Sequence, residues 1–161
     1  MKNFLSSLPF FALLMLFACD PGVVYDHFET MDNGTWGWTD PKEFEVEVSD
    51  TISLHNIYLQ VRHTVEYPMS NLYMFVYVKS PSGQMLKDTV NIMLAEPDGR
   101  WVGKGSGHLR ELMLLYRKQT RFGESGMYTF TLEQGMRNPT LPVTDIGIRI
   151  VRTNQKNVGQ E

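Results

Sequence analysis

The sequence predicts an all-β fold, an antiparallel β-sandwich similar to a jelly roll. Apolar and polar side chains alternate in several short runs, of which 43–48 (EFEVEV) is the clearest, and a period of two is the pattern of a half-buried strand. Turn residues separate these runs about every ten residues, which is typical of sandwiches and barrels. Parallel sheets require repeated crossover helices, and the chain offers no series of helical segments that could supply them.

Taken in order, the expected strands are 43–48, 56–62, 72–79, 85–94, 128–133 and 146–151. The turn signals between them are Pro81-Ser82-Gly83, Pro97-Asp98-Gly99, Gly123 to Gly126 and Asn138-Pro139. The run 72–79 (LYMFVYVK) is apolar on both faces. We therefore expect it to be a central strand that is either covered on both sides or lines a partner surface.

One segment, 107–118 (GHLRELMLLYRK), fits two structures. Leu109, Leu112, Met113 and Tyr116 are spaced as on one face of a helix, but a strand explains the segment equally well. We therefore leave open one short helix near residues 107–118 within the all-β fold.

The N-terminus predicts export and lipid attachment. Residues 1–18 start with a basic residue, Lys2, and continue with an apolar run that is shorter than the ~20 residues of a transmembrane helix, as in a signal peptide. The run ends LFAC, which is similar to a lipobox with Cys19 as the first residue of the mature chain. Cys19 is the single cysteine, so no intramolecular disulfide can form. Several acyl chains on Cys19 would hold the protein stably at a membrane surface.

We divide the chain into four parts: a signal peptide (1–18), a lipidated N-terminus and tether (19–41), the β-sandwich domain (42–153) and a polar tail (154–161). The segment 19–41 mixes Gly, Asp, Asn and aromatic residues without a sustained period. The sandwich has the size of one domain and needs no metal or disulfide for stability. The formal net charge of −3 argues against a nucleic-acid partner, which requires a basic surface.

No arrangement of reactive side chains predicts catalysis, a metal site or a cofactor. His55 and His63 share strand parity but are separated by about 26 Å of extended chain, too far to ligate one ion, and we interpret the histidines as surface imidazoles. The glycines of WVGKGSGH lack the G-K-[ST] sequence of a phosphate loop and predict a flexible or bulged connection. The acidic residues of the expected loops form no recognisable pair: Asp32, Asp40, Glu96, Asp98, Glu124 and Asp145. We therefore expect no enzyme.

Three tryptophans are the candidate contacts to a ligand or a partner protein. Trp36 and Trp38 share parity in TWGW, and Trp101 follows a tight turn. Such rings could stack on sugars or anchor a protein interface. The structural alternative is that they close the ends of the sandwich. Tyr128, two residues after Gly126, could form a tyrosine-corner-like bond to the backbone.

Several stretches of the chain resemble the GldH gliding-motility lipoprotein family of the Bacteroidetes. They are LFAC, KEFEVEVSD, the block 54–78, DGRWVGKGSGHL and, most distinctively, 125–151 (SGMYTFTLEQGMRNPTLPVTDIGIRIV). The resemblance covers nearly the whole chain and contains no catalytic signature. It implies an exported lipoprotein that is needed for gliding over surfaces, in a machinery functionally linked to an outer-membrane secretion system.

The residues and the resemblance together predict a membrane-anchored, non-enzymatic component of the gliding-motility and envelope secretion machinery that binds another envelope protein. We expect it at the outer membrane, where it faces either the periplasm or the cell exterior. The periplasmic side is favoured because the run after Cys19 lacks an obvious surface-export tag. The alternative is a carbohydrate-binding module on a lipoprotein, with glycans stacked on exposed tryptophans. Burial of all three indoles would argue against that alternative.

Overall fold

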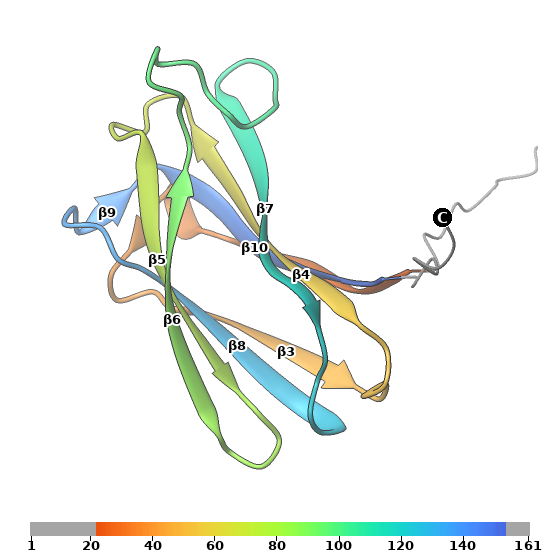
Figure 1. The fold of residues 1–161 in the computed structure, drawn as a ribbon. Helices are drawn as coiled ribbons and strands as arrows, with labels where there is room; N and C mark the ends of the chain where they lie inside the picture. The colour runs from red at the N-terminus through yellow and green to blue at the C-terminus, as the bar shows by residue number, and fades with distance from the viewer. Residues whose placement is uncertain (1–21, 154–161) are drawn as a thin grey trace, which may run out of the picture.

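A computed structural model describes residues 22–153, and this part of the chain is built from strands and contains no α-helix (Figure 1). Its elements are β1 (Val23–Thr30), the 3-10 turn η1 (Asp32–Gly34), β2 (Trp36–Gly37), β3 (Lys42–Val48), β4 (His55–Thr64), β5 (Asn71–Lys79), β6 (Met85–Met93), β7 (Leu109–Thr120), β8 (Gly126–Gln134), β9 (Thr140–Leu141) and β10 (Val143–Arg152). No helix within 22–153 has the length and hydrophobicity to cross a bilayer.

Two four-stranded sheets form the sandwich. The β4 sheet has the order β1-β10-β4-β7, the β5 sheet has the order β3-β8-β5-β6, and the short β2 and β9 pair with each other. Every pairing is antiparallel. With β2 and β9 set aside, the first and last strands are neighbours in one sheet and the second and seventh in the other, which is the connectivity of a jelly roll. The predicted all-β jelly-roll sandwich is confirmed.

The core lies between the two sheets and follows the strand parity that the sequence shows. In β3, for example, Phe44, Val46 and Val48 are buried while the glutamates between them are exposed. Full burial of each such apolar side chain contributes about 1.5–3 kcal/mol. The fully buried centre of the core includes Leu59, Leu72, Met74, Ile92, Leu132, Ile146 and Ile148.

The sandwich starts earlier than we expected. Residues 23–41, which we assigned to a tether, belong to the folded domain, because β1 pairs with β10 along its whole length. The amide N–H of Met31 then donates to the carbonyl of Thr144 (2.8 Å), and Met31 itself is buried. The expected signal peptide, Cys19 and the polar tail fall in 1–21 and 154–161, outside the described residues.

The segment that fitted either a helix or a strand is a strand, so the short helix near 107–118 is wrong. β7 pairs with β4 and forms an edge of its sheet. Leu112 and Leu114 pack against the core, whereas Met113 and Leu115 point outward and are exposed. Apolar residues on both faces of this edge strand produced the spacing that also fits a helix.

The two ends of the sandwich differ in which loops they carry. The chain enters at Gly22, whose carbonyl accepts the amide N–H of Arg152 (2.7 Å), and the amide N–H of Thr153 donates to Leu54 (2.8 Å). Loops 49–54, 80–84 and 121–125 therefore share this end, which we call the Gly22 end. Loops 31–41, 65–70, 94–108 and 135–142 lie at the opposite end, the Trp38 end (Figure 1).

Candidate functional site

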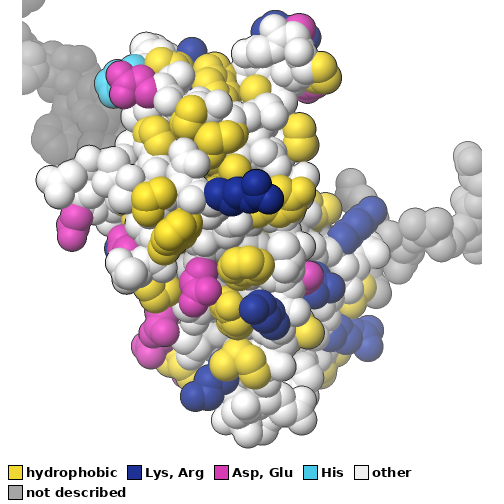
Figure 2. Space-filling view, turned by 90° about the vertical axis from the view of Figure 1, so that its left-hand side faces the viewer, with side chains coloured by type: hydrophobic (Ala, Val, Ile, Leu, Met, Phe, Trp, Pro, Cys, Tyr) yellow, Lys and Arg dark blue, Asp and Glu magenta, His cyan; other side chains and the backbone are white. Residues whose placement is uncertain are grey.

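The outer face of the β5 sheet carries a row of aromatic rings, of which Tyr73 is exposed and Phe75 and Tyr77 are half-buried. β5 buries Leu72, Met74 and Val76 on its inner side, so its other parity turns Tyr73, Phe75 and Tyr77 outward; we call these three the aromatic stripe. Figure 2 shows hydrophobic side chains gathered on the side of the molecule that β5, β6 and β9 form. The run 72–79 is apolar on both faces because one face packs into the core and the other forms this surface. β5 is a central strand, as expected.

Neighbouring residues hold the stripe in place. The Lys87 ammonium lies 5.0 Å from the ring centre of Phe75 and 5.1 Å from that of Tyr77, within the range of cation–π attraction. Phe75 also lies across Gly135, where a Cβ would approach its ring to 3.2 Å. The absence of a side chain at 135 therefore makes room for the ring.

Trp38 and Met136 extend the apolar surface toward the Trp38 end. The Trp38 indole N–H donates to the carbonyl of Met136 (2.8 Å), yet the side chain stays 52 % exposed. The Met136 sulfur accepts the amide N–H of Tyr73 (3.1 Å). Beside these contacts, Met69, Tyr73 and Met136 line an open hollow of about 410 Å³. Trp38 thus remains a candidate contact residue.

The outer face of the β5 sheet is divided by charge. On β3, Glu43, Glu45 and Glu47 are exposed along one side. Lys79 and Lys87 lie on the other side, on β5 and β6 beside the aromatic stripe. A partner that covers this face therefore meets an apolar centre between an acidic and a basic margin.

This surface is suited to binding. Aromatic residues and methionine are enriched at the centres of protein interfaces, where they bury much area at low entropic cost. The sequence pointed to the surface through the run 72–79 but did not single out the three rings. Only the strand register shows that the three rings share one face, and the contacts of Met136 connect that face with Trp38.

The other two tryptophans are buried to different degrees and help to close the sandwich, which is the structural alternative to a contact role. Trp36 is completely buried, and its indole N–H donates to the carbonyl of Asp40 (2.8 Å), so it closes the sandwich and cannot touch a partner in this conformation. Trp101 is half-buried and packs against the core, with its ring 4.7 Å from the imidazole of His63. Trp38 alone of the three is exposed.

Two histidines are not on the surface, contrary to our interpretation. His55 is 1 % exposed beneath Phe122, at a ring distance of 5.4 Å, and His63 is 0 % exposed beneath Trp101. Burial lowers the pKa of both imidazoles below the ordinary value. They lie at opposite ends of β4, and residues 22–153 contain no cluster of three or more possible metal ligands.

The loop carboxylates and glycines have structural contacts. The Glu124 carboxylate accepts the hydroxyl (2.7 Å) and amide (3.1 Å) hydrogens of Ser82, which joins loops 80–84 and 121–125. The Tyr128 hydroxyl accepts the amide N–H of Glu124 (3.2 Å), so the tyrosine-corner-like bond is confirmed. In the glycine-rich loop, a Cβ at Gly105 would lie 2.3 Å from the Leu109 carbonyl oxygen. That loop packs tightly back on β7 in place of forming a phosphate loop.

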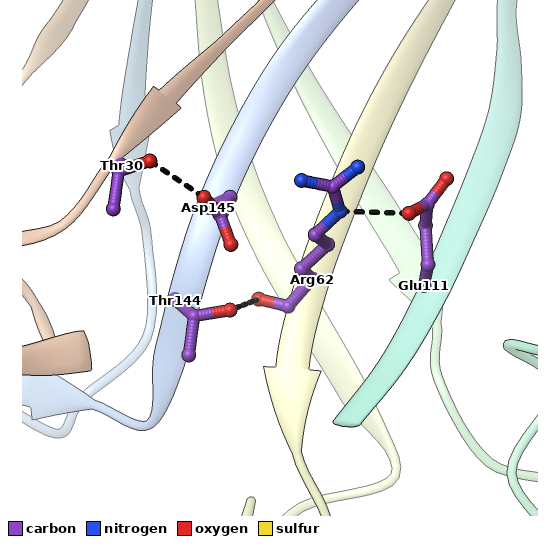
Figure 3. A network of polar contacts seen from close by, with 5 residues as sticks. All are labelled: Thr30, Arg62, Glu111, Thr144 and Asp145. Carbon is purple, nitrogen blue, oxygen red and sulfur yellow. Dashed lines mark hydrogen bonds and ion pairs between the residues drawn. The ribbon is translucent and has the colours of Figure 1, made fainter. Parts of the chain in front are cut away.

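The outer face of the β4 sheet is different, because its polar groups bind one another (Figure 3). The Thr30 hydroxyl donates to the Asp145 carboxylate (2.7 Å), the Arg62 guanidinium donates to the Glu111 carboxylate (2.7 Å), and the Thr144 hydroxyl donates to the Arg62 carbonyl (3.3 Å). These contacts cross all four strands of the sheet.

A close approach of strands tightens this face further. The Arg62 guanidinium lies 3.9 Å above the Phe28 ring, and Arg149 and Asp26 form an ion pair. Between them, a Cβ at Gly147 would lie 2.6 Å from a backbone carbonyl oxygen and 2.9 Å from the Phe28 ring. Over β1, β10 and β4 the face is closed by its own side chains, whereas Met113 and Leu115 of the edge strand β7 stay exposed.

Comparisons with known proteins agree on one family. The model of the family described as "GldH lipoprotein" matches residues 23–150. The chain is 28% identical over 152 residues to a protein named "Gliding motility lipoprotein GldH homolog" from Christiangramia forsetii, covering 89% of this chain and 93% of that protein. It is 29% identical over 147 residues to "Gliding motility lipoprotein GldH" from Flavobacterium johnsoniae, covering 86% and 91%.

Proposed function

Because this chain belongs to the GldH lipoprotein family, we propose that it is a lipid-anchored, non-enzymatic component of the gliding-motility and envelope secretion machinery. It acts by binding another envelope protein. The lipid is carried by Cys19 after removal of residues 1–18, and the sandwich stands in water at the outer membrane, on its periplasmic side. The aromatic stripe and Trp38 form the surface that contacts the partner.

The observation that carries this proposal is the partly exposed aromatic centre of the outer face of the β5 sheet. Folding needs only the inner parity of a strand to be apolar, and β3 shows that glutamates serve on the outer parity. β5 instead places Tyr73, Phe75 and Tyr77 there. A contiguous aromatic surface that the domain's own folding does not require is the usual mark of an interface.

Charge adds a requirement on the partner. Side chains that complement this face are acidic opposite Lys79 and Lys87 and basic opposite the β3 glutamates. Such complementarity fixes orientation and speeds association more than it raises affinity. The partner is therefore expected to present an apolar patch between an acidic and a basic margin.

The anchor is consistent with the position of this surface. Only three residues separate Cys19 from Val23, where β1 begins, so the lipid lies at most about 14 Å from the Gly22 end. β5 runs away from the Trp38 end toward the Gly22 end. A lipid on Cys19 would bring the Gly22 end to the membrane and leave Trp38 and the distal part of the stripe in the aqueous compartment.

The test is to replace the chromosomal gene by a Tyr73→Ser/Phe75→Ser variant. We expect loss of colony spreading at normal protein level, and at least a thirtyfold drop in the amount of partner captured by crosslinking. Removal of two aromatic anchors of an interface costs about 2 kcal/mol or more. The matched control is Met113→Ser/Leu115→Ser, which removes two exposed apolar side chains from the other sheet. Equal spreading defects in both variants would contradict the assignment of the surface.

The anchor is tested separately with Cys19→Ala. We expect this variant to leave the membrane fraction, and intact-mass analysis of the mature wild-type protein should show an acylated cysteine. A bare thiol on a membrane-bound protein would rule out the lipid anchor.

A second candidate function is glycan binding. The one observation that favours it is the exposed indole of Trp38. One open indole is enough to stack on one sugar ring. The test is a fluorescence titration of the protein with envelope polysaccharide. A saturable change in tryptophan emission that disappears in Trp38→Ala would favour this function, and an unchanged emission would exclude it for that polysaccharide.

A further inference from the structure

The two sheets separate along the edge where β6 faces β7, near the Gly22 end. A cavity of about 320 Å³ opens there, and we call it the edge slot. Its walls include the inward side chains of Ile57, Val78 and Phe130 from three different strands. Leu86 also lines it and lies on the inward parity of β6, yet is 50 % exposed. The edge slot is thus a part of the sandwich interior that the protein leaves uncovered.

Irregular pairing of β7 explains why the sheets are open here. On each side of Ile57, β7 contains one more residue than β4 does, which makes the pairing irregular in the manner of a β-bulge, and bulges bend a strand and re-aim its side chains. Within this irregular stretch, Tyr116 and Arg117 both reach the Asp88 carboxylate of β6 (3.3 and 2.7 Å). This contact joins the two edge strands beside the slot.

The rim of the edge slot is basic. Arg117 shares the single carboxylate of Asp88 with Tyr116. Arg121 also lines the slot, is exposed, and has no polar partner within residues 22–153. An apolar interior below a free guanidinium is complementary to a molecule with an apolar tail and an anionic head.

We propose that the edge slot binds the alkyl chain of a single-chain anionic amphiphile, with the chemistry of a long-chain carboxylate, taken from the membrane. The tail lies between the sheets, against Ile57 and Phe130, and the head group pairs with Arg121. The cavity volume is at the lower end of the range for small-ligand sites, which suits one chain. The acyl groups of a lipidated Cys19 are uncharged and do not complement the guanidinium.

The position of the slot fits a membrane source. His55 at the start of β4 packs against Phe122, which lines the slot. The strand partner of His55 is Arg152, whose amide N–H donates to the carbonyl of Gly22. The slot and the point of chain entry therefore share one end of the sandwich. The inference that the ligand comes from the membrane rests on the proposed lipid anchor. The shape and charge of the slot are independent of that anchor.

The test uses the full-chain lipoprotein in phosphatidylcholine nanodiscs and a dodecanoic acid probe with a diazirine on its terminal carbon. After irradiation, we expect labels on Val78, Leu86 or Phe130, and we expect excess dodecanoic acid to suppress them while dodecanol does not. Labels confined to the aromatic stripe, or equal suppression by the alcohol, would overturn the proposal.

A matched pair of variants separates binding from general charge effects. Arg121→Gln should lower slot labelling about tenfold, the loss expected for one charge-assisted hydrogen bond. Lys118→Gln removes the same charge from an exposed position on β7 outside the slot and should stay within twofold of wild type. Equal labelling in the two variants would overturn the role of Arg121. Tyr73→Ser/Phe75→Ser should leave slot labelling unchanged, so this proposal and the partner surface fail independently.

Discussion

The two outer faces of the sandwich differ in what their outward side chains contact. On the β4 sheet, Thr30, Asp145, Arg62 and Glu111 bind one another across the strands, and Gly147 lets the Phe28 ring lie close to the backbone. On the β5 sheet, three aromatic rings remain partly exposed to solvent beside two lysines. The comparison teaches that satisfied polar contacts mark the face that serves the fold. Aromatic area without such contacts marks the face that we propose to bind a partner.

The largest expected effect is on the closed face. Gly147→Ala places a Cβ within 2.6 Å of the His27 carbonyl oxygen, so β1 and β10 must move apart. We expect a loss of about 3 kcal/mol in the free energy of unfolding, the upper range for overpacking, as measured by urea denaturation. The control is Gly123→Ala, because nothing lies within 4 Å of its added Cβ. Similar losses at both glycines would mean that the face is not tightly closed.

A second pair of substitutions compares one ring from each face. Phe28→Ala removes a ring that lies beneath Arg62 and against Gly147, and should destabilise the domain by about 2 kcal/mol. Tyr73→Ala removes a ring that is 43 % exposed and should cost less than about 1 kcal/mol. Thermal and urea unfolding of the two variants provide the comparison. If Tyr73→Ala were the more destabilising, the aromatic stripe would be part of the fold and not a free surface.

Acid should weaken the β4 sheet more than the β5 sheet. His55 and His63 lie on β4, no histidine lies in the β5 sheet, and burial lowers the pKa of both imidazoles. The unfolded chain therefore takes up these protons first as the pH falls below about 6.5. Stability is fully present above that pH and is lost progressively below it, until the lowered folded pKa is reached.

Amide exchange at pH 7.5 and pH 5.5 should show faster opening of β4 than of β5, and His63→Phe should reduce the difference. An equal change in both sheets would contradict this prediction.

The smallest expected effect concerns the ion pair in Figure 3. Arg62 and Glu111 are partly exposed, with side chains 32 % and 46 % accessible, and such pairs contribute at most about 1 kcal/mol because water screens them. Glu111→Gln should therefore lower the free energy of unfolding by about 0.5 kcal/mol, and 1 M salt should reduce the difference further. A loss above about 2 kcal/mol would show that the closed face depends on this pair more than its exposure implies.

The sequence was informative wherever one parity of a strand is buried and the other is not. This holds for β3, whose EFEVEV pattern matches its burial residue by residue. It fails at β1, an edge strand whose two sides are both partly exposed, so its alternation is too weak to distinguish it from a tether. It also fails at β7, where both parities are apolar.

The candidate site could be predicted in part for the same reason. Apolar residues on both faces of 72–79 already indicated that the face turned away from the core contacts something. The strand register then showed which three rings lie on that face. The burial of His55 and His63 had no local signal, because Phe122 and Trp101 cover them from loops distant in sequence. Trp36 and Trp38 are two residues apart, yet one is buried and the other exposed, a difference that depends on their partners across the chain.

The pairing of β1 with β10 also determines how the domain responds to traction. The chain enters through Gly22, and β1 is hydrogen-bonded to β10 from its first residues to its last. A pull on an N-terminal tether against a partner held near Trp38 runs along β1, at right angles to those hydrogen bonds. The bonds are then loaded in shear, so they must rupture together and not one after another. A moving envelope machine could strain this domain considerably before its first strand slips.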